Sequence, residues 1–318
     1  MQKPIRLRDF VRVKDLYFSV IGYKNHEKVK CFLRYAPGDG DRIKDGKKFK
    51  KLSNEEVKGF KEFYDGKIFR IPIEKIDEVF KPEEKLREVM DDELKKVFSF
   101  FEKTVPEDKM GVTGSRLIGL RGKDSDIDFI VYGKYWFLAR EKIRKGIELG
   151  KISEPDEETW NFIYKKRKVP LPYDIFVLHE KRKNHRAFIG STYFDLLYVR
   201  DYDELSRDIP EDPGTKIGFR EVLAEVLDSS FAFDYPSYYL LKSSDIKAVL
   251  SFTHSYAGQA FSGEKIYARG VVEIIDGEKY LVVGTSRETQ EEFIVSVDLL
   301  EKFNLYDEFL KWLRERHP

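Results

Sequence analysis

Apolar and polar residues alternate with a period of two near the start of the chain, as at residues 11–13 and 28–35. Such a period places successive side chains on opposite faces of a β-strand. Residues 37–41 and 44–47 contain the Pro, Gly and Asp residues that are typical of turns. We therefore expect residues 11–52 to form β-hairpins.

After Pro82 the apolar residues recur every three or four positions, which is typical of a helix. The apolar stripe consists of Leu86, Val89, Met90, Leu94 and Val97. Glu83 and Glu84 suit the first turn of this helix, because carboxylates are favoured at the positive end of the helix dipole. The pattern predicts that a new domain begins here.

Strand and helix patterns then alternate as far as residue 178. The expected strands are 111–113, 127–132 and 173–178, and the expected helices lie near 137–149 and 157–167. This alternation predicts an α/β or α+β domain.

The last third of the chain begins with an acidic segment that prolines interrupt, at 201–214, and a helical pattern follows near 216–229. Residues 247–297 are rich in strand patterns, with Asp276-Gly277 as a hairpin turn, and Leu299 to Arg316 has helical spacing. The segment predicts a small β domain with a terminal helix, and its strand count is compatible with an oligonucleotide-binding barrel.

A chain of 318 residues is too long for one core of ordinary size. We predict an α+β protein whose central domain, a small mixed β-sheet flanked by helices, lies between β-rich N-terminal and C-terminal modules. The expected parts are a basic β-rich module (1–82), the central domain (83–200), an acidic connector with a helix (201–246) and the small β domain (247–318).

The composition excludes several classes of protein. Hydrophobic residues make up 41% of the chain, which is enough to build cores and excludes global disorder. A single cysteine, Cys31, excludes a disulfide framework within the chain and a zinc site built from several cysteines. No apolar run approaches the roughly 18 residues of a membrane span. We expect a cytoplasmic protein that does not contact a membrane, and its many charged residues are typical of thermophile proteins.

The formal net charge of +1 conceals an uneven distribution. Residues 1–51 contain 15 Lys and Arg against 6 Asp and Glu. A basic segment of this kind can attract a polyanion such as a nucleic acid, although it can also be an ordinary solvated surface. If it only recruits a polyanion, removing residues 1–80 should leave the chemistry of the central domain intact.

The chemically informative segment is 113–131. Asp126 and Asp128 are two positions apart in an expected strand, so both carboxylates lie on the same face. Their mutual repulsion is offset by a hard cation such as Mg²⁺, and the pair therefore predicts a metal site. Gly114-Ser115 follows a short strand and provides a tight turn with backbone N–H groups suited to a phosphate.

Two other motifs fail in this segment. A Walker A loop needs a glycine where Leu117 stands and a Ser or Thr where Asp124 stands. A calcium-binding EF-hand loop needs a glycine where Phe129 stands and a Glu where Tyr135 stands.

Gly114-Ser115, followed after ten residues by Asp126-Ile127-Asp128, resembles the signature of the DNA polymerase β-like nucleotidyltransferase superfamily. The chain also resembles archaeal predicted nucleotidyltransferases in general character. The resemblance covers roughly residues 85–200 and implies that the central domain is the nucleotidyltransferase domain. It also implies that Gly114 and Ser115 hold the nucleotide phosphates, and that two Mg²⁺ or Mn²⁺ ions bind to Asp126, Asp128 and a third carboxylate.

Two residues are candidates for this third carboxylate. Asp174 lies early in the expected strand 173–178, and Asp195 lies in a later apolar run. We favour Asp174, because its spacing and its flanking residues suit the resemblance better. Arg116, Lys123 and Ser125 are the further residues expected to contact the nucleotide.

These residues predict a metal-dependent transfer of a nucleoside monophosphate from an NTP to an acceptor hydroxyl, with release of pyrophosphate. RNA or DNA is the expected acceptor, since the N-terminal segment is basic. A protein or small-molecule acceptor remains an alternative, as does a protein that binds nucleotides or nucleic acids without turnover. The oligomeric state is left open.

Overall fold

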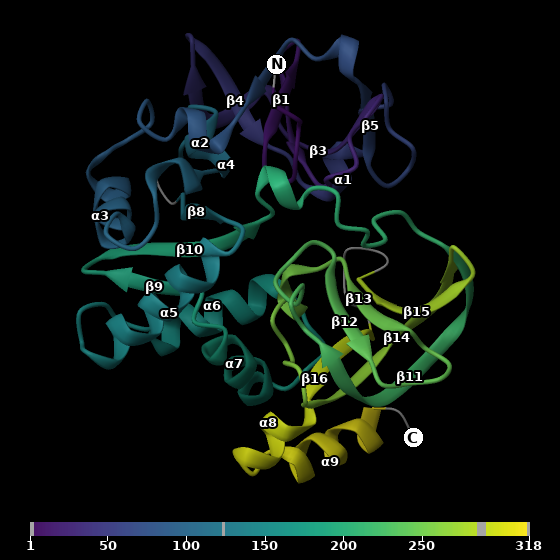
Figure 1. The fold of residues 1–318 in the computed structure, drawn as a ribbon. Helices are drawn as coiled ribbons and strands as arrows, with labels where there is room; N and C mark the ends of the chain where they lie inside the picture. The colour runs from purple at the N-terminus through teal and green to yellow at the C-terminus, as the bar shows by residue number, and fades with distance from the viewer. Residues whose placement is uncertain (1–2, 123–124, 285–290, 317–318) are drawn as a thin grey trace. The chain divides into compact units, whose positions relative to one another are not determined.

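The computed structural model describes three stretches of the chain: 3–122, 125–284 and 291–316. The chain forms two compact units (Figure 1). Unit 1 contains residues 1–153 and 185–207, whereas unit 2 contains residues 154–184 and 208–318. The domain boundaries expected from the sequence stay predictions.

The first sheet of unit 1 is antiparallel throughout. Its strands are β1 (Phe10–Val13), β2 (Leu16–Val20), β3 (Lys28–Lys44), β4 (Lys47–Lys51), β5 (Phe69–Pro72) and β6 (Glu78–Phe80). They are arranged in the order β4-β3-β2-β1-β6, and β5 pairs with β3. The hairpins expected over 11–52 are thus confirmed, and the short helix α1 (Asn54–Val57) follows β4.

The turn expected at 37–41 is wrong, because β3 continues through these residues and only shifts its register between Pro37 and Arg42. Gly40 makes this irregularity possible. A Cβ atom there would lie 2.2 Å from the carbonyl oxygen of Phe49 on β4, so only glycine permits this close approach of the two strands.

The second sheet of unit 1 is small and mixed. Its strands are β7 (Met110–Val112), β8 (Ile127–Tyr132), β9 (Arg186–Ile189) and β10 (Thr192–Val199), in the order β7-β8-β10-β9. β8 and β10 are parallel, and the other neighbours are antiparallel. Helices α3 (Asp92–Phe101) and α5 (Tyr135–Glu148) pack on this sheet, where Phe101 stacks on Phe129.

The helix expected from Pro82 to Val97 is divided in two. α2 (Pro82–Lys85) is short, and α3 begins after Asp91, whose side chain accepts a hydrogen bond of 2.8 Å from the backbone N–H of Leu94. Asp91 is therefore an N-cap that starts a second helix within the apolar stripe.

The two sheets of unit 1 share a hydrophobic core. One face of the first sheet contributes Phe10, Tyr17, Tyr35, Phe49 and Phe80 to it. These side chains pack on Leu117, Ile118 and Leu120, which follow the Gly-Ser turn of the second sheet. All of them are buried, so the N-terminal sheet and the segment that carries the motif are parts of one folded unit.

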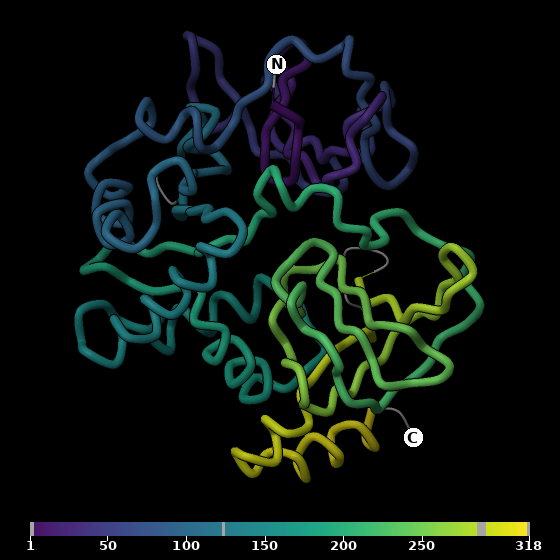
Figure 2. Tube along the Cα trace, viewed as in Figure 1, coloured from purple at the N-terminus to yellow at the C-terminus, as the bar shows by residue number. Residues whose placement is uncertain are grey.

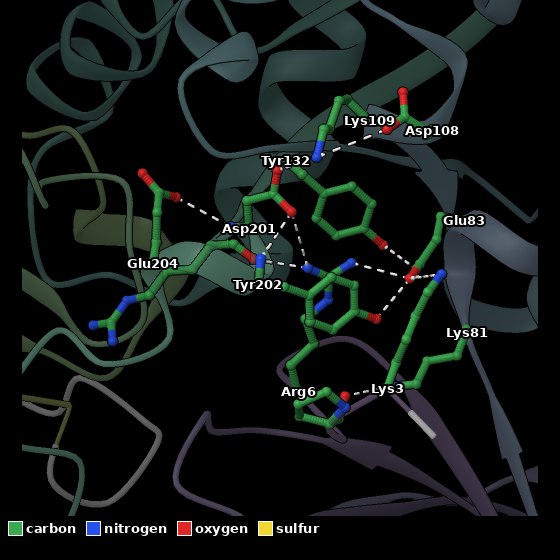
Figure 3. Close-up of polar contacts among 12 residues, drawn as sticks. Lys3, Arg6, Lys81, Glu83, Asp108, Lys109, Tyr132, Asp201, Tyr202 and Glu204 are labelled. Atoms are coloured by element: carbon green, nitrogen blue, oxygen red, sulfur yellow. Dashed lines mark hydrogen bonds and ion pairs between the residues drawn. The ribbon is translucent and has the colours of Figure 1, made fainter. Parts of the chain in front are cut away.

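A buried arginine adds a second link between the N-terminal segment and the mixed sheet (Figure 3). The guanidinium of Arg6 lies between two aromatic rings, 3.8 Å from the ring centre of Tyr132 and 3.7 Å from that of Tyr202. It also pairs with Glu83 at 3.2 Å. Glu83 accepts hydrogen bonds from the hydroxyl groups of Tyr132 (2.8 Å) and Tyr202 (2.7 Å).

Burial by itself would raise the pKa of Glu83, but the charge of Arg6 and these hydrogen bonds hold it at about 2. The carboxylate is therefore charged at every pH at which the protein is expected to work.

Unit 2 combines helices with a β-sheet. Its elements are α6 (Glu157–Arg167), α7 (Tyr173–Arg182), β11 (Thr215–Asp228), β12 (Ser237–Leu241), β13 (Ala248–Ser251), β14 (Lys265–Ile275), β15 (Glu278–Val283), β16 (Phe293–Ser296), α8 (Val297–Lys302) and α9 (Tyr306–Arg316). The strand order is β11-β12-β13-β15-β14-β16, and an additional pairing of β11 with β14 closes part of the sheet into a ring (Figure 2). α7 packs here through His179, whose Nε2 accepts a hydrogen bond of 2.9 Å from the N–H of Ser296.

Two expected elements in unit 2 have the wrong type. Residues 173–178 belong to the helix α7 instead of a strand, and residues 216–229 belong largely to the strand β11 instead of a helix. The helices near 137–149 and 157–167 and the hairpin turn at Asp276-Gly277 are confirmed. Within the described stretches of the chain, every helix is too short or too polar to cross a membrane.

Candidate active site

Two aspartates lie side by side on the parallel strands β8 and β10. Asp128 on β8 and Asp195 on β10 are register partners. Asp126 precedes β8 directly and is exposed, whereas Asp128 is half-buried. The alternation along β8 buries Ile127 and Phe129. The structure thus gathers carboxylates on the two central strands of the mixed sheet.

The carboxylate of Asp128 is electrostatically strained. Burial raises its pKa most, and the negative charges of Asp195 and Asp126 raise it further. The positive charges of Arg8 and Arg34 oppose this shift. A bound cation would relieve the repulsion among the three aspartates.

Asp195 is held in place by two neighbours. The hydroxyl group of Tyr193 donates a hydrogen bond of 2.9 Å to its Oδ1 atom. The Nε atom of the buried Arg186 lies 3.3 Å from the same oxygen. These contacts orient the carboxylate through its Oδ1 atom.

The Gly-Ser turn lies directly against Asp128. The backbone N–H of Thr113 donates a hydrogen bond of 3.0 Å to the carbonyl oxygen of Asp128, and Gly114 then starts the short helix α4 (Gly114–Leu117). Gly114 has a φ of +72°, and a Cβ atom there would lie 2.6 Å from Oδ2 of Asp128. Glycine is required both by the backbone conformation and by the space that the carboxylate occupies.

The other residues expected to bind the nucleotide have different surroundings. Arg116 is buried, and its guanidinium pairs with Asp91 and, at 2.6 Å, with Glu93. Ser125 accepts a hydrogen bond of 2.9 Å from the N–H of Gly122, so it closes a turn of the loop. Lys123 lies outside the described residues.

The reason for preferring Asp174 as the third carboxylate is wrong. Asp174 does not lie on a strand: it is an exposed residue in the first turn of α7, in unit 2. Asp195, the rival, is the residue that lies in register with Asp128.

The donor atoms of the three aspartates suit a hard cation. Asp126, Asp128 and Asp195 offer only carboxylate oxygens, which Mg²⁺ and Mn²⁺ prefer, and the repulsion at Asp128 favours a cation. Within residues 3–122, 125–284 and 291–316, no three Asp, Glu, His or Cys side chains converge into a complete metal-binding group. Mg²⁺ commonly takes one or two carboxylates together with substrate phosphates, so a complete protein cage is not required.

Sequence reasoning missed the N-terminal residues near Asp128. The positive charges of Arg8 and Arg34 oppose the rise in the pKa of Asp128, and Tyr35 packs in the buried cluster that contains Leu117. The positive charge of residues 1–51 was the only signal for them, and it could not distinguish these residues from surface lysines.

Comparison with known proteins places this geometry in a family. Residues 92–194 match the model of the nucleotidyltransferase domain, and this range contains Gly114, Ser115, Asp126 and Asp128. The chain belongs to the nucleotidyltransferase family. Asp195 follows directly after the last matched residue.

A relative extends the similarity beyond this domain. The chain is 37% identical over 335 residues to an uncharacterized protein of the archaeon Methanocaldococcus jannaschii, and the similarity covers 91% of this chain and 98% of that protein. No solved structure matches the chain significantly. The similarity to this relative therefore extends well beyond residues 92–194.

Proposed function

We propose that this nucleotidyltransferase is metal-dependent and transfers a nucleoside monophosphate from an NTP to an acceptor hydroxyl. The observation that carries the proposal is the pairing of Asp128 with Asp195 beside the Gly114 turn. Two carboxylates in register lie next to a backbone turn that only glycine permits. Metal-bound phosphates can approach closely at such a site.

We assign Asp195 as the third carboxylate in place of Asp174. The parallel pairing of β8 and β10 supports this assignment, since it fixes Asp195 beside Asp128. The assignment also gives a role to Tyr193 and Arg186, which fix the orientation of the Asp195 carboxylate.

Asp126, Asp128 and Asp195 would hold two divalent ions, which when bound supply positive charge to the α-phosphate and to the leaving pyrophosphate. The acceptor oxygen forms a bond to the α-phosphorus, and the bond from that phosphorus to the bridging oxygen of the β-phosphate breaks. Asp195 takes the proton of the acceptor hydroxyl, and Gly114 lets the phosphates approach the backbone without hindrance.

RNA or DNA is the acceptor that we propose, because residues 1–51 have 15 basic against 6 acidic side chains. The experiment uses the full chain with each of the four NTPs, labelled either at the α- or at the γ-phosphate, with Mg²⁺ or Mn²⁺, and with total RNA, DNA or protein.

Transfer of α-label but not of γ-label to RNA or DNA is the expected result, and Asp128→Asn should abolish it. Transfer to protein would overturn the acceptor assignment but retain the reaction. Transfer of γ-label would show a phosphotransferase, and nucleotide binding without any transfer would show a binding protein; either result would overturn the proposed function.

A further inference from the structure

The N-terminal sheet has an irregularity at the point where it meets the Gly-Ser turn. Tyr17 pairs with Tyr35, but the next residue, Phe18, pairs with Leu33, so Arg34 is an extra residue in β3. Such bulges redirect side chains and recur next to active sites. As a result Leu33 stays in the core on one face of the sheet, whereas Tyr35 joins the core that contacts Leu117.

Two contacts connect this face of the sheet to the motif itself. Tyr35 packs in the same buried cluster as Leu117, which lies two residues after Ser115. The hydroxyl group of Thr113 donates a hydrogen bond of 2.7 Å to the carbonyl oxygen of Arg8. Arg8 has a φ of +73°, a left-handed conformation that non-glycine residues rarely adopt and that clusters at functional sites.

Thr113 connects Arg8 to Asp128, because its hydroxyl group bonds to the carbonyl oxygen of Arg8 and its N–H bonds to that of Asp128. The charges of Arg8 and Arg34 oppose the rise in the pKa of Asp128. Both residues are half-buried. Within the parts of the chain that the structure describes, the Arg34 guanidinium makes no hydrogen bond or ion pair. Arg34 is therefore a half-buried cation near these aspartates.

Arg42 and Lys44, farther along β3, have a different role. Arg42 donates a hydrogen bond of 2.5 Å to the carbonyl oxygen of Leu120, and Lys44 donates one of 2.8 Å to that of Ile118. These two cations hold the loop between α4 and β8, so they are positioning residues.

We propose that the N-terminal sheet completes the nucleotide site, with Arg34 and Arg8 binding the polyphosphate of the NTP. The inference rests on the proposed function. An arginine presents a fork of N–H donors that matches phosphate oxygens, and the β- and γ-phosphates carry the charge that such donors recognise. The carboxylates would hold the metal ions, which supply positive charge to the polyphosphate when bound, and the two arginines would bind its oxygens directly.

The test compares Arg34→Gln and Arg8→Gln with Arg12→Gln, a control on β1 of the same sheet whose side chain pairs with Glu78 at 3.2 Å. Calorimetry with Mg²⁺ measures the affinity of the full chain for ATP, GTP, CTP and UTP, and then for the monophosphate of the tightest binder and for tripolyphosphate. Thermal unfolding of each variant confirms that it is folded.

Removing one charge-assisted contact should weaken binding of the NTP and of tripolyphosphate by about tenfold or more in Arg34→Gln, with a loss in the same direction in Arg8→Gln. Affinity for the monophosphate should change little, and Arg12→Gln should bind like the wild type. Unchanged NTP affinity in Arg34→Gln, or an equal loss for NTP and monophosphate, would overturn the proposal.

A loss confined to acceptor binding would assign Arg34 to the acceptor and would also overturn it. If the wild type binds NTP and transfers α-label, these outcomes refute the arginine assignment alone. A wild type that binds none of the four NTPs refutes the proposed function together with it.

Discussion

Glu83 allows a quantitative test of the link between the N-terminal segment and the mixed sheet. Its side chain is only 6% exposed and contacts Arg6 and two tyrosine hydroxyl groups. The difference between an ordinary Glu pKa of 4.5 and the value of about 2 in the fold corresponds to roughly 3 kcal/mol of stability at neutral pH. Glu83→Gln should therefore lower the free energy of unfolding by about 3 kcal/mol at pH 7, also because it leaves Arg6 buried without its carboxylate.

The sign of the pH dependence follows from the depressed pKa. The unfolded chain takes up the proton first as the pH falls, so the stabilisation is complete above the ordinary pKa of 4.5 and is lost as the pH approaches 2. At about pH 3 more than half of the difference between wild type and Glu83→Gln should have disappeared.

Denaturant unfolding followed by circular dichroism at pH 7 and pH 3 measures both quantities. Glu84→Gln is the matched control: this neighbour is 52% exposed and pairs with Lys3 on the surface, so its loss should cost less than about 1 kcal/mol. A loss below 1 kcal/mol in Glu83→Gln at pH 7, or a loss that is the same at both pH values, would refute the reasoning.

Three further variants test the site and its connection to the first sheet. Asp128→Asn should abolish transfer and raise the melting temperature of the metal-free protein at pH 7, because its carboxyl pKa is raised in the fold; equal melting temperatures in calorimetry would contradict this. Gly114→Val and its control Gly190→Val both place Val in a left-handed conformation, at a cost of about 1–2 kcal/mol, but only at Gly114 does the new Cβ atom contact Asp128. The affinity for NTP, measured by calorimetry, should therefore fall in Gly114→Val alone. Equal affinities in the two variants would count against a phosphate-binding turn. Deletion of residues 1–80 should unfold unit 1 instead of leaving it active, since the core over Leu117 is lost; a soluble, cooperatively melting fragment that binds NTP would disprove this.

The carboxylate strand could be predicted because its signal is local. In residues 127–132 the polar Asp128 stands between buried apolar neighbours, and the glycine and aspartates of the motif lie within fifteen residues of each other. Any strand that buries one face in a core and presents polar functional side chains on the other shows this alternation, whatever the fold.

The wrong element type expected at 173–178 has a physical reason. Residues 175–178 form a short apolar run that suits a buried strand and a helix equally well. Pro172 immediately before the helix and Asp174 in its first turn are helix-start signals, and they should have decided between the two. The apolar spacing of residues 216–229 is typical of a helix, but pairing with β14 over ten positions makes this segment the strand β11.

The contribution of the first sheet to the site could not be predicted. The excess of positive charge in residues 1–51 was visible, but the positions of Arg8 and Arg34 near Asp128 depend on a bulge and on a core shared by segments more than seventy residues apart. Such contacts are set by tertiary packing, which leaves no periodic signal in the sequence.

The most direct test of the central claim is the transfer of α-labelled NTP by Asp195→Asn and Asp174→Asn, compared with the wild type at saturating Mg²⁺. If Asp195 completes the site with Asp126 and Asp128, Asp195→Asn should lose about a thousandfold or more in turnover, as loss of an electrostatic catalytic group does. Asp174→Asn should retain wild-type turnover. The opposite result, with activity lost at Asp174 and retained at Asp195, would contradict the proposed active site.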